Sequence, residues 1–273
     1  PVALYGLPAD MDPIMDIAVS NELFVVEDSA ECFLGKYKGR LSGTIGDMGI
    51  FSFERSKHMT TGNGGMIITN NEKLAEEARK FSILGYSTLK AGAYESKPPK
   101  NVIQDPGFYR HLFVSPNYRL PEVCAAMALA QLEKLDELVK KRMEIAMFYR
   151  EAIKDCDWLI PQATPDGFVN SYWTYAVRLD TDATAISWND FRKVYIKNGG
   201  ESYYAAWALT YLEPALKGKI FSENNIKYKK GLCPVAEKIQ PQMKQLKTNF
   251  ENLGYAKQQA EILKKTIGRF KNI

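Results

Sequence analysis

Three short apolar runs in the first seventy residues constrain the fold more than any other feature of the sequence. They cover residues 23–26, 49–53 and 66–69. The first run, Leu-Phe-Val-Val, contains no polar residue, which is typical of strands buried on both faces of a parallel sheet. Each run is too short for a helix, so we expect three strands.

Helical patterns stand on both sides of these runs. Asp12 followed by Pro13 predicts an N-cap and the first position of a helix with an apolar face. A second helix is expected over about residues 72–82, capped by Asn70 or Asn71. The order helix, strand, strand, strand, helix predicts α/β architecture.

The rest of the chain predicts a long loop, a helical region and a smaller mixed portion. Residues 86–108 are rich in Lys, Pro and Gly without periodicity, so we expect a loop or insertion there. Pro121 opens a helical region that reaches about residue 153. The later patterns predict a strand over 173–177, a helix capped by Ser187 and stopped by Gly199-Gly200, a short element from residue 232, and a final helix over about 255–270. We therefore expect a large domain, residues 1–154, and a small α+β domain, residues 155–273.

Composition places the chain among ordinary globular proteins. At 273 residues, with 45% hydrophobic and 25% charged residues, it is long enough for two domains. No stretch approaches the ~18 uncharged apolar residues of a membrane span, and the first 22 residues lack a signal-peptide pattern. The four cysteines are far apart without a C-x-x-C pair, which argues against a zinc site or a disulfide framework and favours a reducing, cytoplasmic compartment.

Histidines and the basic C-terminal third give weak functional signals. The two histidines, His58 and His111, are too few for a metal site or a His-centred triad, so no metal is expected. From residue 216 onward, 13 Lys/Arg stand against 4 Asp/Glu, a net charge of +9. Nucleic-acid binding is one interpretation, but the lysines are dispersed and no nucleic-acid module signature accompanies them. A solvated helical surface is the favoured interpretation.

Polar and glycine-rich segments lie at the ends of the predicted strands, where open α/β sheets hold their ligands, and the glycine-rich segment leads into the third strand. They are Glu27-Asp28-Ser29-Ala30-Glu31, Ser52-Phe53-Glu54-Arg55-Ser56-Lys57 and Thr60-Thr61-Gly62-Asn63-Gly64-Gly65. Each has an ordinary structural explanation, because acids cap turns, loop lysines are usually solvated, and glycines permit tight turns or close backbone approach. Their combination at this spacing indicates a site.

This combination resembles the DegT/DnrJ/EryC1/StrS family of sugar aminotransferases, a branch of the fold-type I pyridoxal-phosphate enzymes. The family pattern is an acidic pair after a strand, a Ser-Phe five residues before a lysine, and then Thr-Gly-x-Gly-Gly. Further similar segments are Asp-Met-Asp-Pro-Ile-Met-Asp at 10–16, Lys38-Gly39-Arg40, Gly46-Asp47, Asn117-Tyr118-Arg119-Leu120 and the Ala-Gln-Leu-Glu-Lys-Leu helix at 130–135. The resemblance covers essentially the whole chain up to about Ala152 and, more loosely, the rest, and it implies a three-layer α/β/α large domain of the fold-type I kind, incomplete at its N-terminus, with a smaller α+β C-terminal domain.

The resemblance gives three residues a role in binding pyridoxal 5'-phosphate. Lys57 corresponds to the lysine that holds the cofactor covalently and that shuttles a proton during catalysis. Asp28 is expected to pair with the pyridine nitrogen, since a carboxylate there favours the protonated, electron-accepting ring. Ser52 is expected to donate its hydroxyl to the cofactor phosphate.

Two more residues extend the implied site. Asn117 resembles the amide that reaches the phosphate from the neighbouring subunit, which implies a homodimer with shared active sites. Glu31 stands near the expected 3-hydroxyl of the cofactor, as in perosamine-synthase-like members, and would share a proton with the phenolate. Asn63 replaces the more common Glu of the glycine-rich turn without a catalytic consequence.

The early position of Lys57 implies that part of the family fold is missing. In the family this lysine lies much deeper in the chain, after a Gly-Ser/Thr turn that cradles the phosphate at a helix N-terminus and an aromatic residue that stacks on the ring. We therefore expect the sequence to lack the N-terminal half of the large domain, as a fragment or as a truncated protein.

The implied activity is amino transfer from glutamate to a nucleotide-linked 4-keto-6-deoxy sugar in polysaccharide biosynthesis. Lys57 favours amination over the family's sugar 3-dehydratases, which carry His there, and Glu31 favours a perosamine-like product. Residues 199–207 are expected near the sugar nucleotide, with aromatic side chains that either stack on it or pack in the core. The alternatives are a truncated, non-catalytic member that serves as a dimerisation or binding module, and a C-terminal third that binds nucleic acid.

Overall fold

The computed structural model describes residues 1–92, 98–216 and 227–270, and the chain forms two compact units. Unit 1 contains residues 1–139 and 166–171, and unit 2 contains residues 140–165 and 172–273. The predicted loop at 86–108 and the basic C-terminal segment fall partly outside the described residues. The two domains expected from the sequence stay a prediction.

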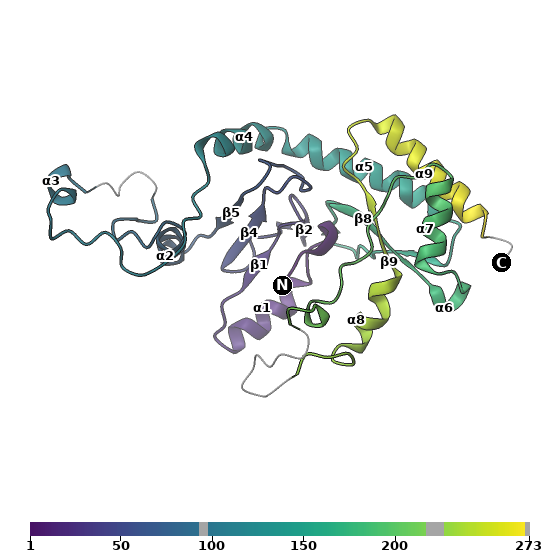
Figure 1. Ribbon diagram of the computed structural model, residues 1–273, viewed down its shortest axis with the longest axis horizontal. Helices are drawn as coiled ribbons and strands as arrows, with labels where there is room; N and C mark the ends of the chain where they lie inside the picture. Colours follow the sequence, from purple (N-terminus) through teal and green to yellow (C-terminus); the bar gives the residue numbers. More distant parts are fainter. Residues whose placement is uncertain (93–97, 217–226, 271–273) are drawn as a thin grey trace. The chain divides into compact units, whose positions relative to one another are not determined.

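Unit 1 is built on a three-stranded sheet with the order β1-β4-β5 (Figure 1). Its strands are β1 (Val26–Asp28), β4 (Met48–Ser52) and β5 (Gly65–Ile68). β1 and β4 are parallel, whereas β4 and β5 are antiparallel. The ends of β1 and β4 and the beginning of β5 therefore lie at one edge of the sheet.

The other elements of unit 1 are short strands and helices. They are η1 (Leu4–Gly6), α1 (Met11–Ser20), β2 (Lys36–Tyr37), β3 (Arg40–Leu41), α2 (Glu72–Ser82), α3 (Lys100–Ile103), α4 (Glu122–Leu132) and β7 (Phe168–Val169). β3, β2 and β7 form a second small sheet, so residues near 168 pair with a strand more than a hundred residues earlier.

Most predicted elements of unit 1 are confirmed. β4 and β5 match the second and third apolar runs to within one residue. α2 is capped by Asn71, whose side chain accepts the N–H of Leu74 at 3.2 Å. Pro121 lies directly before α4 rather than at its first position, and the helical region divides into α4 and α5 (Leu135–Ile153).

The prediction for the first apolar run is wrong. β1 begins only at Val26, which is 43% exposed, and Leu23 and Phe24 lie before the strand and are exposed too. Val25 is the buried member of the run. Its N–H donates to the Asp47 carboxylate at 2.7 Å and its carbonyl accepts the Asp47 N–H at 2.8 Å. Asp47 therefore fixes this segment, and the strand is not buried on both faces.

The prediction for the start of the first helix is also wrong. α1 begins at Met11 with Asp10 as its N-cap residue. The Asp12 carboxylate instead accepts hydrogen bonds from Lys38 at 2.7 Å and from Arg40 at 2.5 Å. The bond from Lys38, followed by a bond from Tyr37, lowers the pKa of Asp12 to about 2. Asp12 is thus the second residue of α1, inside its first turn, and its carboxylate joins the helix to the segment at 38–40.

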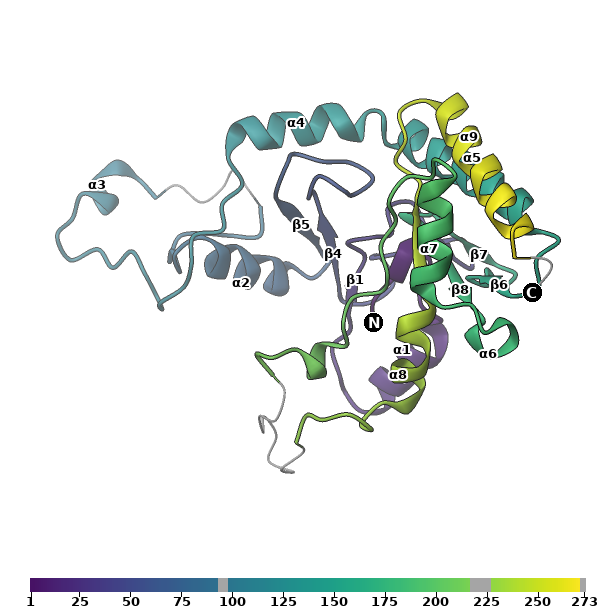
Figure 2. The same cartoon turned by 45° about the vertical axis from the view of Figure 1, so that its right-hand side comes forward.

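Unit 2 contains an antiparallel sheet with the order β6-β8-β9. Its strands are β6 (Leu159–Pro161), β8 (Thr174–Leu179) and β9 (Met243–Lys247), and its main helices are α7 (Trp188–Lys197) and α9 (Leu253–Gly268). Shorter elements are α6 (Thr181–Thr184), η2 (Thr210–Leu212), α8 (Pro234–Ile239) and η3 (Gln240–Gln242). α9 runs beside the second half of α5 in both views (Figures 1 and 2).

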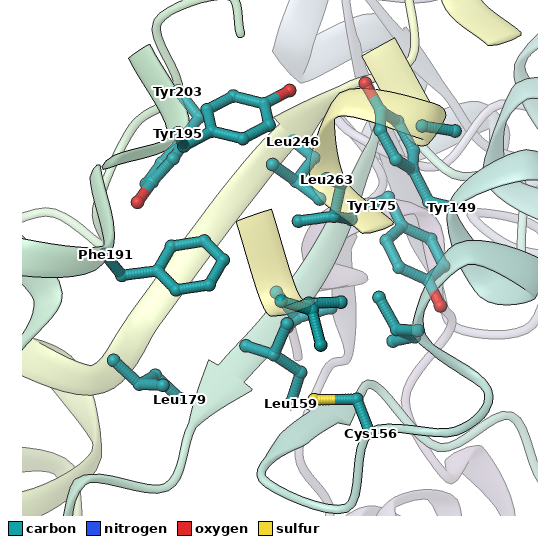
Figure 3. Packing of buried hydrophobic residues seen from close by; sticks show 14 of the residues in the cluster. Tyr149, Cys156, Leu159, Tyr175, Leu179, Phe191, Tyr195, Tyr203, Leu246 and Leu263 are labelled. Carbon is teal, nitrogen blue, oxygen red and sulfur yellow. The ribbon is translucent and has the colours of Figure 1, made fainter. Parts of the chain in front are cut away.

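The core of unit 2 forms where these helices cover the sheet. Buried side chains from α5, β6, β8, α7, β9 and α9 meet there, among them the almost completely buried Phe191 and Leu246 (Figure 3). The predicted cap of α7 is confirmed, since the Ser187 hydroxyl accepts the Asp190 N–H at 3.0 Å. Within the described ranges, no helix has both the length and the apolar character needed to cross a membrane.

Candidate active site

The polar segments that follow β1 and β4 meet at one edge of the unit 1 sheet. Asp28 ends β1 and Ser52 ends β4. Asp28 lies opposite Ile50, and Ser52 follows Ile50 by two residues, so Asp28 and Ser52 lie on the same face of the sheet. The structure therefore brings together two of the residues that the resemblance assigned to the cofactor.

Lys57 and Glu31 form an ion pair near this edge. Lys57 Nζ lies 3.2 Å from Glu31 Oε1, and the two side chains are only 14% and 18% exposed. The other carboxylate oxygen of Glu31 accepts the backbone N–H of Tyr5 at 3.2 Å. Glu31 is thus held from two sides, and the amine of Lys57 is largely shielded from solvent.

Tyr5 reaches Glu31 through an unusual backbone conformation. Its φ is 63°, in the left-handed region that residues other than Gly rarely adopt. Its ring is buried, and burial together with the nearby Glu31 charge raises the pKa of the hydroxyl. Sequence reasoning missed Tyr5, because no local pattern marks a backbone N–H that is aimed at a side chain 26 residues away.

The glycine-rich turn holds both ends of the segment that carries Lys57. The Phe53 N–H donates to the Gly64 carbonyl at 2.9 Å, and the Thr61 N–H donates to the Phe53 carbonyl at 3.0 Å. Gly64 has a φ of 138°, and a Cβ on Gly65 would lie 2.8 Å from the Phe51 carbonyl oxygen. These positions therefore need glycine for close approach, as the sequence predicted.

Glu27 has a structural role in the acidic segment. Its buried carboxylate accepts three backbone N–H groups, from Gly43 at 2.8 Å, Ile45 at 2.6 Å and Gly46 at 2.7 Å. The turn at 43–46 is thereby fixed against β1, directly beside Asp28. The ordinary explanation of acids in this segment, turn capping, thus applies to Glu27.

Asn117 contacts residues other than the four remaining candidates. In the part of the chain that the structure describes, its side chain accepts hydrogen bonds from Arg119, with the guanidinium Nε at 2.9 Å, and its backbone pairs with Ile83. The residue is exposed.

The aromatic residues of the 199–207 segment divide between core and surface. Tyr203 is buried, with its ring centre 5.4 Å from that of Trp188 and 5.5 Å from that of Tyr195. Tyr204 and Trp207 are exposed. Tyr203 therefore serves in core packing, whereas the rings of Tyr204 and Trp207 are accessible to solvent.

The residues at the sheet edge fit pyridoxal phosphate by their chemistry. A shielded primary amine at Lys57 suits its aldehyde, the Asp28 carboxylate suits a protonated ring nitrogen, and the Ser52 hydroxyl is a donor for its phosphate. Among the residues described, no three His, Cys, Asp or Glu side chains gather in a group able to hold a metal ion.

The fold is that of the fold-type I pyridoxal-phosphate aminotransferases. The structure is similar to the X-ray structure of the aminotransferase from Psychrobacter cryohalolentis. The match covers 98% of this chain and 68% of that chain, with a TM-score of 0.81 and 26% sequence identity. The sequence pattern of the DegT/DnrJ/EryC1/StrS aminotransferase family matches residues 1–260. The chain therefore belongs to this family.

The similar proteins include two whose names refer to the synthesis of a sugar nucleotide and of a polysaccharide. GDP-perosamine synthase of Escherichia coli O157:H7 is 36% identical over 176 residues, which is 64% of this chain and 43% of that protein. The spore coat polysaccharide biosynthesis protein SpsC of Bacillus subtilis (strain 168) is 33% identical over 188 residues, 68% of this chain and 46% of that protein. The chain spans about half the length of the curated relatives it matches.

Proposed function

We propose that this chain carries the cofactor lysine of a pyridoxal-phosphate-dependent aminotransferase that acts on a nucleotide-linked 4-keto-6-deoxy sugar, with glutamate as the amino donor. The observation that carries the proposal is the shielded Lys57–Glu31 pair, 3.2 Å apart, at the sheet edge that also holds Asp28 and Ser52. Family membership supports the reaction class.

Each residue at the edge has a task that its position supports. When bound, pyridoxal phosphate supplies an aldehyde that condenses with amines and a ring that accepts electrons. Lys57 Nζ holds the cofactor and, once released, moves a proton to or from the carbon that bears the amino group. Asp28 keeps a proton on the ring nitrogen, and Ser52 donates its hydroxyl to the phosphate. Glu31 orients the amine of Lys57.

The sugar substrate is proposed from relatives and from one residue. GDP-perosamine synthases of two organisms are each 36% identical to this chain over their matched regions. Glu31, which distinguishes perosamine-synthase-like members in the resemblance, contacts the amine directly. The exposed rings of Tyr204 and Trp207 are available for stacking on a base or sugar.

We propose a homodimer in which Asn117 of one copy completes the phosphate site of the other. Asn117 lies in an exposed segment with large apolar neighbours, Leu112, Val114 and Tyr118. The next helix, α4, is apolar, and none of its residues is buried. A second copy of this chain would cover this exposed polar residue and the apolar surface together. The four free thiols support a cytoplasmic location.

The proposed activity is tested with GDP-4-keto-6-deoxymannose, glutamate and pyridoxal phosphate. The expected products are the 4-amino sugar nucleotide and 2-oxoglutarate in equal amounts. Lys57→Arg keeps the charge opposite Glu31 but has no amine that condenses with the cofactor, so it should form no product. Lys80→Arg is the matched control, because Lys80 also lies in ion pairs, with Glu76 and Glu77 on α2. No product from the native chain, or equal product from Lys57→Arg, overturns the proposal.

A further inference from the structure

His58 follows Lys57 directly and is buried. Its ring Nε2 donates to the backbone carbonyl of Ser171 at 3.0 Å, a contact between residues 113 positions apart. The ring of Phe33 lies 5.8 Å from the His58 ring, centre to centre. A directed hydrogen bond therefore ties the residue next to the proposed cofactor lysine to a distant segment of unit 1.

Ser171 holds a second segment of unit 1 as well. Its N–H donates to the Gly6 carbonyl at 2.8 Å, and its hydroxyl donates to the same oxygen at 3.2 Å. The Cys32 thiol is a third donor to this carbonyl, at 3.1 Å, and burial raises the pKa of this thiol to about 11, so it stays protonated. Ser171 is completely buried. The turn that ends at Gly6 is thus fixed by several contacts.

This turn leads back to the ion pair. Tyr5 precedes Gly6, and its N–H donates to Glu31 Oε2, while Glu31 Oε1 contacts Lys57 Nζ. The contacts form a closed path from Lys57 to His58, through Ser171 and the Tyr5–Gly6 turn, to Glu31 and back to Lys57. Ser171 uses its carbonyl for one arm and its N–H for the other. Both partners of the ion pair are therefore connected, through hydrogen bonds or adjacent residues, to the buried Ser171.

We propose that His58 is a positioning residue whose hydrogen bond to Ser171 holds the Lys57 amine against Glu31. Two adjacent residues in an irregular segment cannot move independently, so anchoring the ring restricts where the Lys57 side chain starts. An intramolecular hydrogen bond changes a local equilibrium by about two- to tenfold. This inference rests on the proposed function for the role of Lys57 in holding the cofactor. The position of the Lys57 amine follows from the contacts alone.

Two substitutions separate the hydrogen bond from the packing of the ring. His58→Phe keeps an aromatic ring beside Phe33 and removes the N–H donor. His58→Gln keeps a terminal N–H donor and removes the ring. His111→Phe is the matched control, because His111 also donates from its ring to a backbone carbonyl, that of Leu84 at 2.7 Å, but is exposed.

The readout is the acetylation rate of Lys57 by acetic anhydride, which transfers one acetyl group to the amine and releases acetate, without cofactor, measured by peptide mass spectrometry against the exposed Lys73. We expect His58→Phe to raise the rate about two- to tenfold, and His58→Gln and His111→Phe to leave it near the native value. A native rate in folded His58→Phe, or an equal rise in His58→Phe and His58→Gln, overturns the proposal.

A second readout separates this inference from the proposed function. Pyridoxal phosphate fixed on Lys57 by borohydride should fall by a similar factor in His58→Phe and recover in His58→Gln. If the native protein fixes no cofactor while His58→Phe still exposes the amine, the positioning role stands and the proposed function fails. If the native protein fixes cofactor and His58→Phe changes neither readout, the positioning role fails alone.

Discussion

Glu27→Gln replaces one carboxylate oxygen by an NH2 group in the buried contact between β1 and the turn before β4. In the native chain, Glu27 Oε1 accepts the N–H groups of Ile45 and Gly46, and Oε2 accepts that of Gly43. Whichever way the new amide turns, at least one backbone donor then faces another donor. No rotation of the side chain satisfies all three N–H groups.

The structure sets the size of the effect. In the better orientation, the amide oxygen keeps Ile45 and Gly46, and the Gly43 N–H is left buried without an acceptor, which costs about 1–3 kcal/mol. The two bonds that remain change from charge-assisted to neutral and lose about half their strength. We therefore expect the free energy of opening this part of unit 1 to fall by about 2–4 kcal/mol.

Amide hydrogen exchange of peptides that cover residues 43–52 is the suitable assay. Tryptophan fluorescence does not report on unit 1, because all four tryptophans, at positions 158, 173, 188 and 207, belong to unit 2. The expected loss corresponds to exchange at least about 30-fold faster. Glu77→Gln is the control, since that carboxylate is exposed on α2 and should leave these peptides unchanged. A change below about threefold in Glu27→Gln would refute this reasoning.

Three further predictions concern unit 2, where tryptophan fluorescence during urea unfolding is the assay. Ser187→Ala removes the cap of α7 and should cost about 1 kcal/mol, and no loss would contradict the capping contact. Leu246→Ala opens a cavity in the core and should cost about 3 kcal/mol, and a loss below about 1 kcal/mol would contradict its close packing there. Burial lowers the pKa of Lys244 to about 7, although its amine lies 4.9 Å from the Phe191 ring centre. Between pH 7 and about 10 the unfolded chain then binds more protons than the folded chain, so the unfolding free energy should rise with pH, and Lys244→Met should remove that rise; an equal rise in the variant would contradict it.

Local chemistry explains the elements that the sequence predicted well. α2 and α7 begin where Asn71 and Ser187 satisfy free N–H groups of the first turn, which needs no distant partner. β9 escaped prediction because Met-Lys-Gln-Leu-Lys has no strong apolar run. It becomes a strand through pairing with β8, from Thr174 opposite Lys247 to Arg178 opposite Met243. Such pairing between distant segments leaves no local signal.

In the candidate site, too, some features follow from the local sequence and others depend on contacts between distant segments. The places of Asp28 and Ser52 at one sheet edge follow from strand order, and the glycine turn follows from backbone geometry. The approach of Lys57 to Glu31 is a contact across 26 positions, and that of His58 to Ser171 spans 113. Neither contact is encoded by a local pattern, so both required the structure.

Borohydride reduction of the chain with pyridoxal phosphate tests the central claim, that Lys57 holds the cofactor, most directly. The account predicts one reduced adduct, on the peptide that contains Lys57, which is absent from Lys57→Arg and unchanged in Lys80→Arg. Failure to form this adduct, or labelling that is spread over the exposed lysines and unaffected by Lys57→Arg, would contradict the account.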